Sequence, residues 1–294
     1  MALQLRARQS RLSGKVLILI GTVLIVPSIL PAMLQKFVDQ FVYYPTRYPD
    51  GDWDGRRRAG AEDVWLSSKD GVKLNAWWFP QPTAEYATLF LHGNGGNVTH
   101  RIDHSEAVKQ AGSAILVLDY RGYGRSEGRP SERGLYQDAG AAYDDLVRRG
   151  YPPNRIILHG ESLGTAVATE LASRRQCAAL ILESPLASLS RMAGQVIPII
   201  GPVLAHGFNT EKRIRDVHVP LLVIHGDTDE VVPFVQGQMV YERANQPKTF
   251  WRVKGARHND LLYVAGDDYL KQLRAFYASI GAHPKERHTK LKTQ

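Results

Sequence analysis

A serine flanked by glycines stands where an apolar run gives way to a helix-like stretch. The pentapeptide Gly160-Glu161-Ser162-Leu163-Gly164 follows the apolar residues 155–159 and opens the segment 163–173, in which apolar residues recur at helical spacing. A serine at a sharp turn between a strand and a helix projects its hydroxyl out of the sheet, and glycines on either side avoid collisions with neighbouring backbone. This context predicts that Ser162 is a nucleophile and that the chain is a hydrolase.

The same pattern occurs a second time, in the pentapeptide 124–128, which is centred on Ser126. Here the preceding strand-like run has already ended at Asp119, and Arg129-Pro130 follows, which cannot continue a helix. Ser126 is therefore expected to lie in a loop and not to react.

Serine hydrolysis needs a base that accepts the hydroxyl proton and a carboxylate that orients this base. The apolar run 221–225 leads into a loop that contains Asp227 and Asp229, and the next run, 249–253, leads into a loop that contains His258. The carboxyl ends of parallel strands meet at one edge of a sheet, so the acids and the histidine are expected together at that edge.

The elements that must position these residues alternate along the chain. A hairpin of strands 64–67 and 72–79 comes first, and a short strand at 87–91 follows. Further helices are expected at 98–110, 134–149, 163–173, 233–244 and 260–279, and further strands at 114–119, 155–159, 178–183, 221–225 and 249–253. This order predicts an α/β fold, with a mostly parallel central sheet, an antiparallel N-terminal hairpin and helices on both faces.

These motifs together resemble the α/β-hydrolase superfamily over about residues 62–280. The resemblance is carried by His92-Gly93-Asn94-Gly95-Gly96-Asn97, by residues 119–128, by the pentapeptide 160–164, by His225-Gly226-Asp227-Thr228-Asp229 and by the chain order Ser, Asp, His. Within the superfamily, the sequence resembles the membrane-anchored serine hydrolases of the monoacylglycerol-lipase-like and abhydrolase-domain depalmitoylase group.

The resemblance implies a role for each site residue. Asp229, three residues after the glycine of His225-Gly226, would be the acid, and His258 would be the base. Asp227 is the alternative acid, and its other expected role is to accept hydrogen bonds from loop amides. The oxyanion hole would combine the backbone N–H of Leu163, at the start of a helix, with the backbone N–H of Asn94, which the resemblance implies.

Composition and charge exclude several other classes of protein. The 294 residues are 44% hydrophobic, which predicts one large domain. Of the net charge of +8, residues 1–15 carry +4 and residues 283–294 carry +3, which leaves +1 for the rest and no basic stripe for a nucleic acid. The single cysteine, Cys177, is expected to be a buried thiol, and the expected chemistry needs no metal ion or organic cofactor.

An uncharged stretch near the N-terminus, residues 16–35, separates Lys15 from Lys36. At ~1.5 Å per residue it could span a hydrocarbon core of ~30 Å, which predicts a transmembrane signal anchor, with a cleaved signal peptide as the alternative. More Lys and Arg residues precede the stretch than follow it. A single-pass membrane protein is therefore expected, with a cytoplasmic N-terminus and the catalytic domain on the outer or periplasmic side.

The expected division of the chain is a basic flank (1–15), the anchor (16–35), a linker (36–61), the hydrolase domain (62–280) and a basic tail (281–294). Residues 186–218 interrupt the alternation with an apolar segment, which is expected to form a small cap. A short apolar cap over the serine would make a groove suited to an acyl chain, so a lipid or acylated small-molecule substrate is one hypothesis. Ordinary packing of the cap onto the sheet is the other.

The leading hypothesis is a serine hydrolase that cleaves a carboxylic ester or thioester through an acyl intermediate on Ser162. A serine peptidase of the same fold is an alternative, because ester and amide cleavage use the same constellation of residues. A catalytically inactive, membrane-tethered binding module is a third possibility from a different class.

Overall fold

The computed structural model describes residues 39–199 and 201–280 of the chain. Two compact units are distinguished, residues 1–42 and 43–294, and the fold reported below is that of the second unit. The predicted basic flank and basic tail, 1–15 and 281–294, lie outside the described residues.

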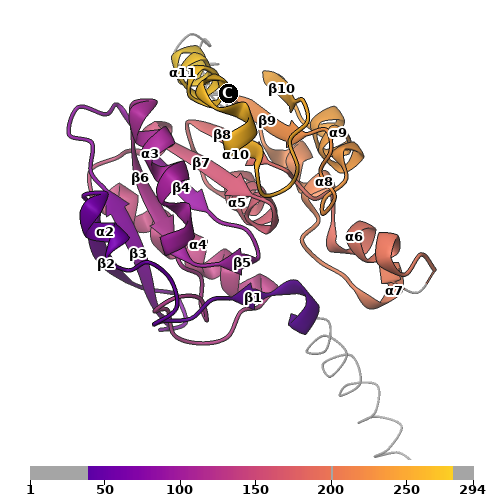
Figure 1. Ribbon diagram of the computed structural model, residues 1–294, viewed down its shortest axis with the longest axis horizontal. Helices are drawn as coiled ribbons and strands as arrows, with labels where there is room; N and C mark the ends of the chain where they lie inside the picture. The colour runs from indigo at the N-terminus through magenta and orange to yellow at the C-terminus, as the bar shows by residue number, and fades with distance from the viewer. Residues whose placement is uncertain (1–38, 200, 281–294) are drawn as a thin grey trace, which may run out of the picture. The chain divides into compact units, whose positions relative to one another are not determined.

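An eight-stranded sheet, with the strand order β10-β9-β8-β7-β4-β6-β3-β2, forms the centre of this unit (Figure 1). Within the described residues only β3 runs antiparallel to its neighbours, and the other pairs in the sheet are parallel. The strands are β2 (Glu62–Ser67), β3 (Lys73–Phe79), β4 (Tyr86–Leu91), β6 (Ser113–Leu118), β7 (Ile156–Glu161), β8 (Ala179–Glu183), β9 (Leu221–Gly226) and β10 (Lys248–Val253). The predicted mostly parallel sheet with an antiparallel N-terminal hairpin is confirmed.

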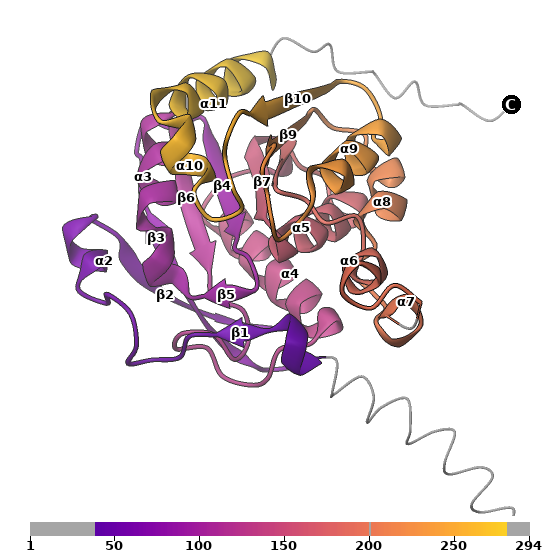
Figure 2. The ribbon, with the colours of Figure 1, turned by 45° about the vertical axis from the view of Figure 1, so that its right-hand side comes forward.

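Helices cover both faces of the sheet (Figures 1 and 2). The helices α3 (Ile102–Gln110) and α11 (Asp267–Ile280) pack against each other on one face, while α4 (Glu132–Arg148), α5 (Leu163–Arg174) and α9 (Phe234–Arg243) lie on the other. Since both faces are covered, the central strands are mostly apolar, as Leu158, Leu180 and Val223 illustrate with no exposed surface.

The helix expected at 260–279 is divided in two by Gly266. α10 (Leu261–Ala265) ends at this glycine, whose φ of 51° is in the left-handed region, and α11 begins at the next residue. A glycine adopts this conformation without the strain that a side chain would add. The chain therefore changes direction between the loop that carries His258 and the helix that covers the sheet.

The insertion between β8 and β9 is helical. It contains α6 (Leu189–Val196), α7 (Gly201–Leu204), α8 (Thr210–Arg213) and the 3-10 turn η3 (Ile214–Asp216). Ser188 starts α6 by accepting a hydrogen bond from the backbone N–H of Arg191. None of the residues in α6 is fully buried, and the helix packs against α7.

A second, two-stranded sheet connects the start of the unit to the glycine-rich loop. Strand β1 (Tyr44–Pro45) pairs in parallel with β5 (Gly95–Gly96). β1 lies within the segment expected to be a linker, 36–61, which also contains the short helix α2 (Gly55–Arg58). Part of this segment is thus hydrogen-bonded to a loop that borders the site described below.

The membrane predictions are corrected. A bilayer core of ~30 Å requires about 20 predominantly apolar residues in a helix, whereas the longest helix in 39–199 and 201–280, α4, has 17 residues and includes Asp144 and Arg148. No helix in that part of the chain is long and apolar enough to cross a membrane. This finding overturns the predicted transmembrane helix, signal anchor and single-pass location, and the stretch 16–35 on which they rested lies outside the described residues.

Two glycines of the α4 region allow a test of how backbone conformation contributes to stability. An added Cβ would meet no atom within 4 Å at Gly140, inside α4, or at Gly150, just after it, but Gly150 has a φ of 94°. We expect Gly140→Ala to raise the free energy of unfolding by about 0.5–1 kcal/mol and Gly150→Ala to lower it by about 1–2 kcal/mol. Urea unfolding of the two variants measures both values, and equal effects would contradict the explanation.

Candidate active site

Ser162 lies at a turn that only flanking glycines permit. β7 ends at Glu161 and α5 begins at Leu163, and between them Ser162 has a φ of 50° and a ψ of −116°, a strained conformation for a residue with a side chain. A Cβ on Gly160 would lie 2.5 Å from the carbonyl oxygen of Gly164, and one on Gly164 would lie 1.8 Å from that of Leu91. Gly164 therefore allows the turn to pack directly against the end of β4, and Gly160 allows the end of β7 to approach the first turn of α5.

Ser162, His258 and Asp229 form a continuous chain of hydrogen bonds. The Ser162 Oγ lies 3.0 Å from His258 Nε2, and His258 Nδ1 lies 2.8 Å from Asp229 Oδ2. Since the carboxylate can only accept, Nδ1 carries a proton, and Nε2 is left to accept from the serine hydroxyl. The side chain of His258 is 9% exposed and that of Asp229 is not exposed, so water reaches the imidazole but not the acid.

The Asp229 carboxylate is held from both of its oxygens. Oδ1 accepts the backbone N–H groups of Val231 and Val232 at 2.9 and 2.8 Å, while Oδ2 accepts from His258. Burial by itself would raise the pKa of Asp229, but the hydrogen bonds from His225 and His258 and from the loop amide outweigh it and hold the pKa well below its ordinary value. The acid is therefore ionised at neutral pH and fixed in direction.

Asp227, the other acid of this loop, contacts neither His258 nor Ser162 among the interactions found in the structure. Its Oδ1 accepts the Gly255 N–H at 2.6 Å and its Oδ2 accepts from Arg252 Nε at 2.8 Å. These contacts tie the loop after β9 to the loop after β10. The structure thus brings Asp229, and not Asp227, to the histidine.

The glycine-rich loop after β4 lies against Ser162. A Cβ on Gly93 would be 3.3 Å from the Cβ of Ser162. The peptide groups around Asn94 are anchored, because the carbonyl of Gly93 accepts from His92 Nδ1 at 2.7 Å and that of Asn94 accepts from the Tyr44 N–H at 2.9 Å and the Tyr123 hydroxyl at 2.8 Å. Leu163 is the first residue of α5, where backbone N–H groups have no partner within the helix. The oxyanion roles of Asn94 and Leu163 stay predictions.

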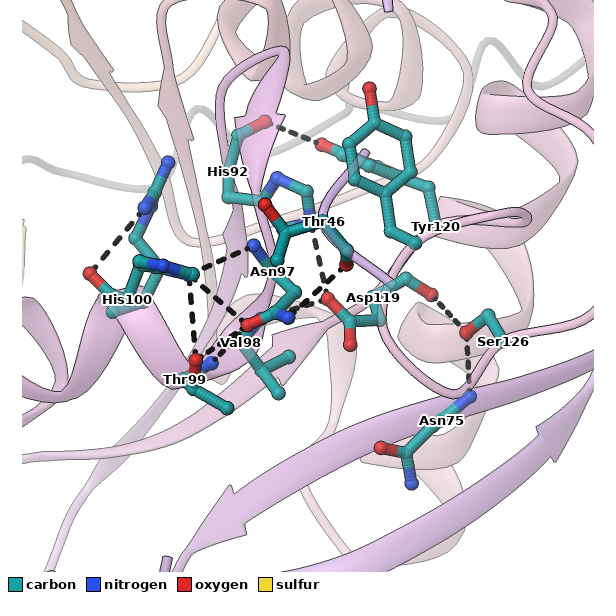
Figure 3. A network of polar contacts seen from close by, with 12 residues as sticks. Thr46, Asn75, His92, Asn97, Val98, Thr99, His100, Asp119, Tyr120 and Ser126 are labelled. Atoms are coloured by element: carbon teal, nitrogen blue, oxygen red, sulfur yellow. Dashed lines mark hydrogen bonds and ion pairs between the residues drawn. The ribbon is translucent and has the colours of Figure 1, made fainter. Parts of the chain in front are cut away.

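A buried polar network holds the segment that follows this loop (Figure 3). The Asp119 Oδ1 accepts the Val98 N–H at 2.8 Å, and the Asn97 side chain donates to the carbonyl of Thr46 at 3.1 Å while it accepts from the Thr99 N–H at 3.0 Å. These residues come from three separate segments of the chain, so the loop is fixed by contacts that are distant in sequence.

Ser126, the centre of the second pentapeptide, belongs to the same network. Figure 3 shows it between Asn75 and Asp119: its Oγ accepts the Asn75 N–H at 2.8 Å and donates to the carbonyl of Asp119 at 2.7 Å. It is 8% exposed, and its hydroxyl links β3 to the loop after β6. The hydroxyl has a structural task here and no contact with an imidazole.

Arg101 joins the two segments that border the serine, a contact that no sequence pattern predicts. Its Nε donates to Glu161 Oε2 at 2.6 Å, and its Nη2 donates to the carbonyl of Gly95 at 3.2 Å. Glu161 immediately precedes Ser162, whereas Gly95 immediately follows Asn94. Arg101 itself is part of no recognisable pattern, so only the folded chain reveals the connection.

A second feature that no sequence pattern predicts is a buried carboxylate near the Ser162 turn. Glu183, at the end of β8, accepts from His159 Nε2 at 2.6 Å and from the Tyr269 hydroxyl, and it lies 3.4 Å from His104 Nε2. Burial opposes its ionisation, but the two imidazoles outweigh burial and hold the pKa of Glu183 well below its ordinary value. This cluster explains how an ionised carboxylate is accommodated at the end of β8, where the Glu183 carbonyl accepts the Ser162 N–H at 2.9 Å.

A cleft of about 890 Å³ lies between α4 and α5 and is lined by residues that include Glu132, Tyr136 and Arg213. Ser162, Asp229 and His258 are not among its lining residues, so the site described above does not open into it. In the part of the chain that is described, no group of three or more His, Cys, Asp or Glu side chains is placed to hold a metal ion.

Comparison with known proteins places the chain in a family. A family model described as serine aminopeptidase, S33, matches residues 82–210. An uncharacterized protein of Mycobacterium tuberculosis is 37% identical over 81% of this chain and 86% of its own length. The mouse alpha/beta hydrolase domain-containing protein 17C is 39% identical over 76% of this chain and 71% of its own length.

The chain belongs to the α/β-hydrolase superfamily. An esterase from Pyrococcus furiosus has a solved structure that matches with a TM-score of 0.69 at 22% identity, over 81% of this chain and 98% of that one, which supports the same fold. The superfamily prediction is thereby confirmed, and this α/β hydrolase is identified as a hydrolytic enzyme.

Replacement of the second serine separates the two pentapeptides. In Ser126→Ala the Asn75 N–H loses its buried acceptor, so we expect the free energy of unfolding to fall by about 1–3 kcal/mol. Hydrolytic activity of the folded variant should stay within about twofold of wild type, because Ser126 touches no residue of the Ser162 site. Urea unfolding and ester turnover measure the two effects, and a loss of turnover in the folded variant would contradict this interpretation.

Proposed function

We propose that this α/β hydrolase cleaves a carboxylic ester or thioester through an acyl intermediate on Ser162. The observation that carries the proposal is the unbroken hydrogen-bond chain from the Ser162 hydroxyl through His258 to the Asp229 carboxylate. The order and tautomer of this chain are those needed to deprotonate the hydroxyl as it attacks.

In the first half of the reaction, Ser162 Oγ attacks the substrate carbonyl carbon while His258 Nε2 takes the hydroxyl proton. The Asp229 carboxylate stabilises the imidazolium that forms, and the Leu163 and Asn94 N–H groups would receive the negative charge of the tetrahedral intermediate. Collapse of this intermediate breaks the bond to the leaving group, and His258 gives the proton to the departing alcohol or thiol.

In the second half, water attacks the acyl-Ser162 carbonyl while His258 again acts as base. The second tetrahedral intermediate expels Ser162 Oγ, which recovers the proton from His258, and the carboxylic acid product leaves. No electron transfer or additional reactant is required, so the residues of this chain and water account for every atom.

The cap suggests an apolar acyl group. Val196 at the end of α6 and Ile199 after it are 81% and 86% exposed, and Tyr263 in α10, which follows the His258 loop, is 89% exposed. Apolar side chains exposed to this extent provide surface for an aliphatic substrate. The family description as a serine aminopeptidase makes amides the second candidate class, which acyl esters and aminoacyl amides tested side by side would separate.

Removal of the nucleophile tests the proposal directly. A fluorophosphonate probe should label the wild-type protein on Ser162, and Ser162→Ala should lose both labelling and ester turnover, because no other hydroxyl is hydrogen-bonded to His258 in the described residues. Labelling is read by mass spectrometry of the modified peptide. Modification of Ser162→Ala at another serine, with turnover retained, would exclude the proposed intermediate.

The two aspartates of the loop after β9 form a matched pair. Asp229→Asn should lower kcat by about 10⁴-fold, because the amide no longer holds His258 in the productive tautomer. Asp227→Asn should lower kcat by no more than a few fold, since this carboxylate contacts Gly255 and Arg252 instead. Steady-state kinetics with one acyl ester measures both, and a larger loss in Asp227→Asn would reverse the assignment.

A further inference from the structure

A second imidazole contacts the acid of the proposed site. His225, in β9, is fully buried, and its Nε2 lies 2.9 Å from the carbonyl oxygen of Val232 and 3.3 Å from Asp229 Oδ2. Asp229 Oδ2 is the same oxygen that accepts from His258 Nδ1 at 2.8 Å. Two histidines thus converge on one carboxylate oxygen.

The hydrogen-bond partners determine the protonation of His225. The Val232 carbonyl can only accept, so Nε2 carries a proton. Nδ1 has no hydrogen-bond partner within the described residues, and a Cβ on Gly237 would lie 2.1 Å from it. A proton on Nδ1 would be buried without an acceptor, so His225 is the neutral Nε2–H tautomer. Its one N–H is shared between a carbonyl and a carboxylate.

Packing fixes the direction of this donor. The ring of His225 meets that of Phe234 edge-on, with centroids 5.5 Å apart and an interplanar angle of 69°, and the missing side chain of Gly237 leaves room for its Nδ1. The imidazole therefore cannot turn away from Asp229 without displacing α9, which carries both residues.

We propose that His225 is a positioning residue for Asp229. Its imidazole restrains the Asp229 carboxylate, and the negative charge of Oδ2 is shared between His225 and His258. The inference rests on the proposed function, because it concerns how the acid supports the base. Two backbone amides hold Oδ1 and two imidazoles hold Oδ2, so the carboxylate is kept in the plane that His258 requires.

The hydrogen bond from His225 takes up part of the negative charge of Asp229 Oδ2 and so weakens the interaction of this oxygen with His258. Without His225, Oδ2 would stabilise the His258 cation more strongly, and the acid limb of the pH–rate profile would move to higher pH. The other charged groups at this loop have their own partners: Glu230 accepts the backbone N–H of His258 at 3.4 Å, and Asp227 pairs with Arg252. Neither pairing involves His225.

The experiment compares the pH dependence of kcat and KM in four proteins: wild type, His225→Leu, His225→Gln and Val223→Ala. Leucine removes the donor, whereas glutamine places an N–H near the position of Nε2. Val223 lies on the same face of β9, is fully buried and has no hydrogen-bonding side chain, so its truncation is a control for destabilisation of the strand.

We expect His225→Leu to lower kcat by about tenfold or more, because Asp229 loses one hydrogen bond and is no longer held in the plane that His258 requires. KM should be unchanged, and the acid limb should lie at higher pH. His225→Gln should restore most of the rate and the position of the limb, and Val223→Ala should reduce thermal stability without a shift of the limb. If His225→Leu and Val223→Ala show the same kcat and the same limb, His225 is a structural residue and the inference is wrong.

One further measurement keeps the inference testable apart from activity. NMR of imidazole-labelled protein should show the titration midpoint of His258 at higher pH in His225→Leu than in wild type, whether or not Ser162 is the nucleophile. An unchanged midpoint, with Ser162 essential, would overturn the inference alone, whereas turnover by Ser162→Ala would overturn the proposed function alone. Should His225→Leu fail to fold, Gly237→Ala takes its place, because the added methyl collides with His225 Nδ1 and should move the midpoint in the same direction.

Discussion

The close approach of the Ser162 turn to the end of β4 is the constraint on which the rest of the site depends. Gly164 lies so near the carbonyls of Leu91 and His92 that any side chain would collide with them. The turn and the glycine-rich loop are therefore parts of one packed unit, and the strained backbone of Ser162 is held by contacts on both sides. The serine hydroxyl and the loop that would bind the oxyanion owe their relative position to this contact.

Buried charge at the carboxyl edge of the sheet is the second requirement of this arrangement. Asp229 and Glu183 are both buried, and each is surrounded by donors that keep its carboxylate ionised. A buried carboxylate without such partners would take up a proton and lose its direction. Two histidines contact each of them, so imidazole side chains are the common partners of the buried carboxylates near the serine.

Local patterns in the sequence were enough to predict the sheet and to select Ser162. The strand before Gly160 and the helix after Leu163 distinguish this serine from Ser126, and the loops after two later strands contain Asp229 and His258. Such features can be predicted from the sequence because each depends on a few consecutive residues and on the rule that parallel strands end at one edge of the sheet. The catalytic roles still rest on the geometry and on the proposed reaction.

Other parts of the site could not be predicted, because they are contacts between segments far apart in the chain. Arg101 has no pattern that indicates Glu161, 60 residues away, as its partner. The motif that contains His225 predicts the acids that follow it. The contact of His225 with Asp229 depends on how the loop folds back and on the space at Gly237. The division of the last helix by Gly266 likewise follows from one backbone angle that composition does not reveal.

Strand β1 connects the beginning of the second unit to the glycine-rich loop. The backbone N–H of Tyr44 donates to the carbonyl of Asn94, so the position of the residue whose own N–H is the predicted oxyanion donor depends on a segment about 50 residues earlier in the chain. A protein shortened to begin at residue 62 would keep Ser162 and His258 but would lose this hydrogen bond. The compact unit that contains the site accordingly begins at Tyr43, ahead of this contact, and not at residue 62.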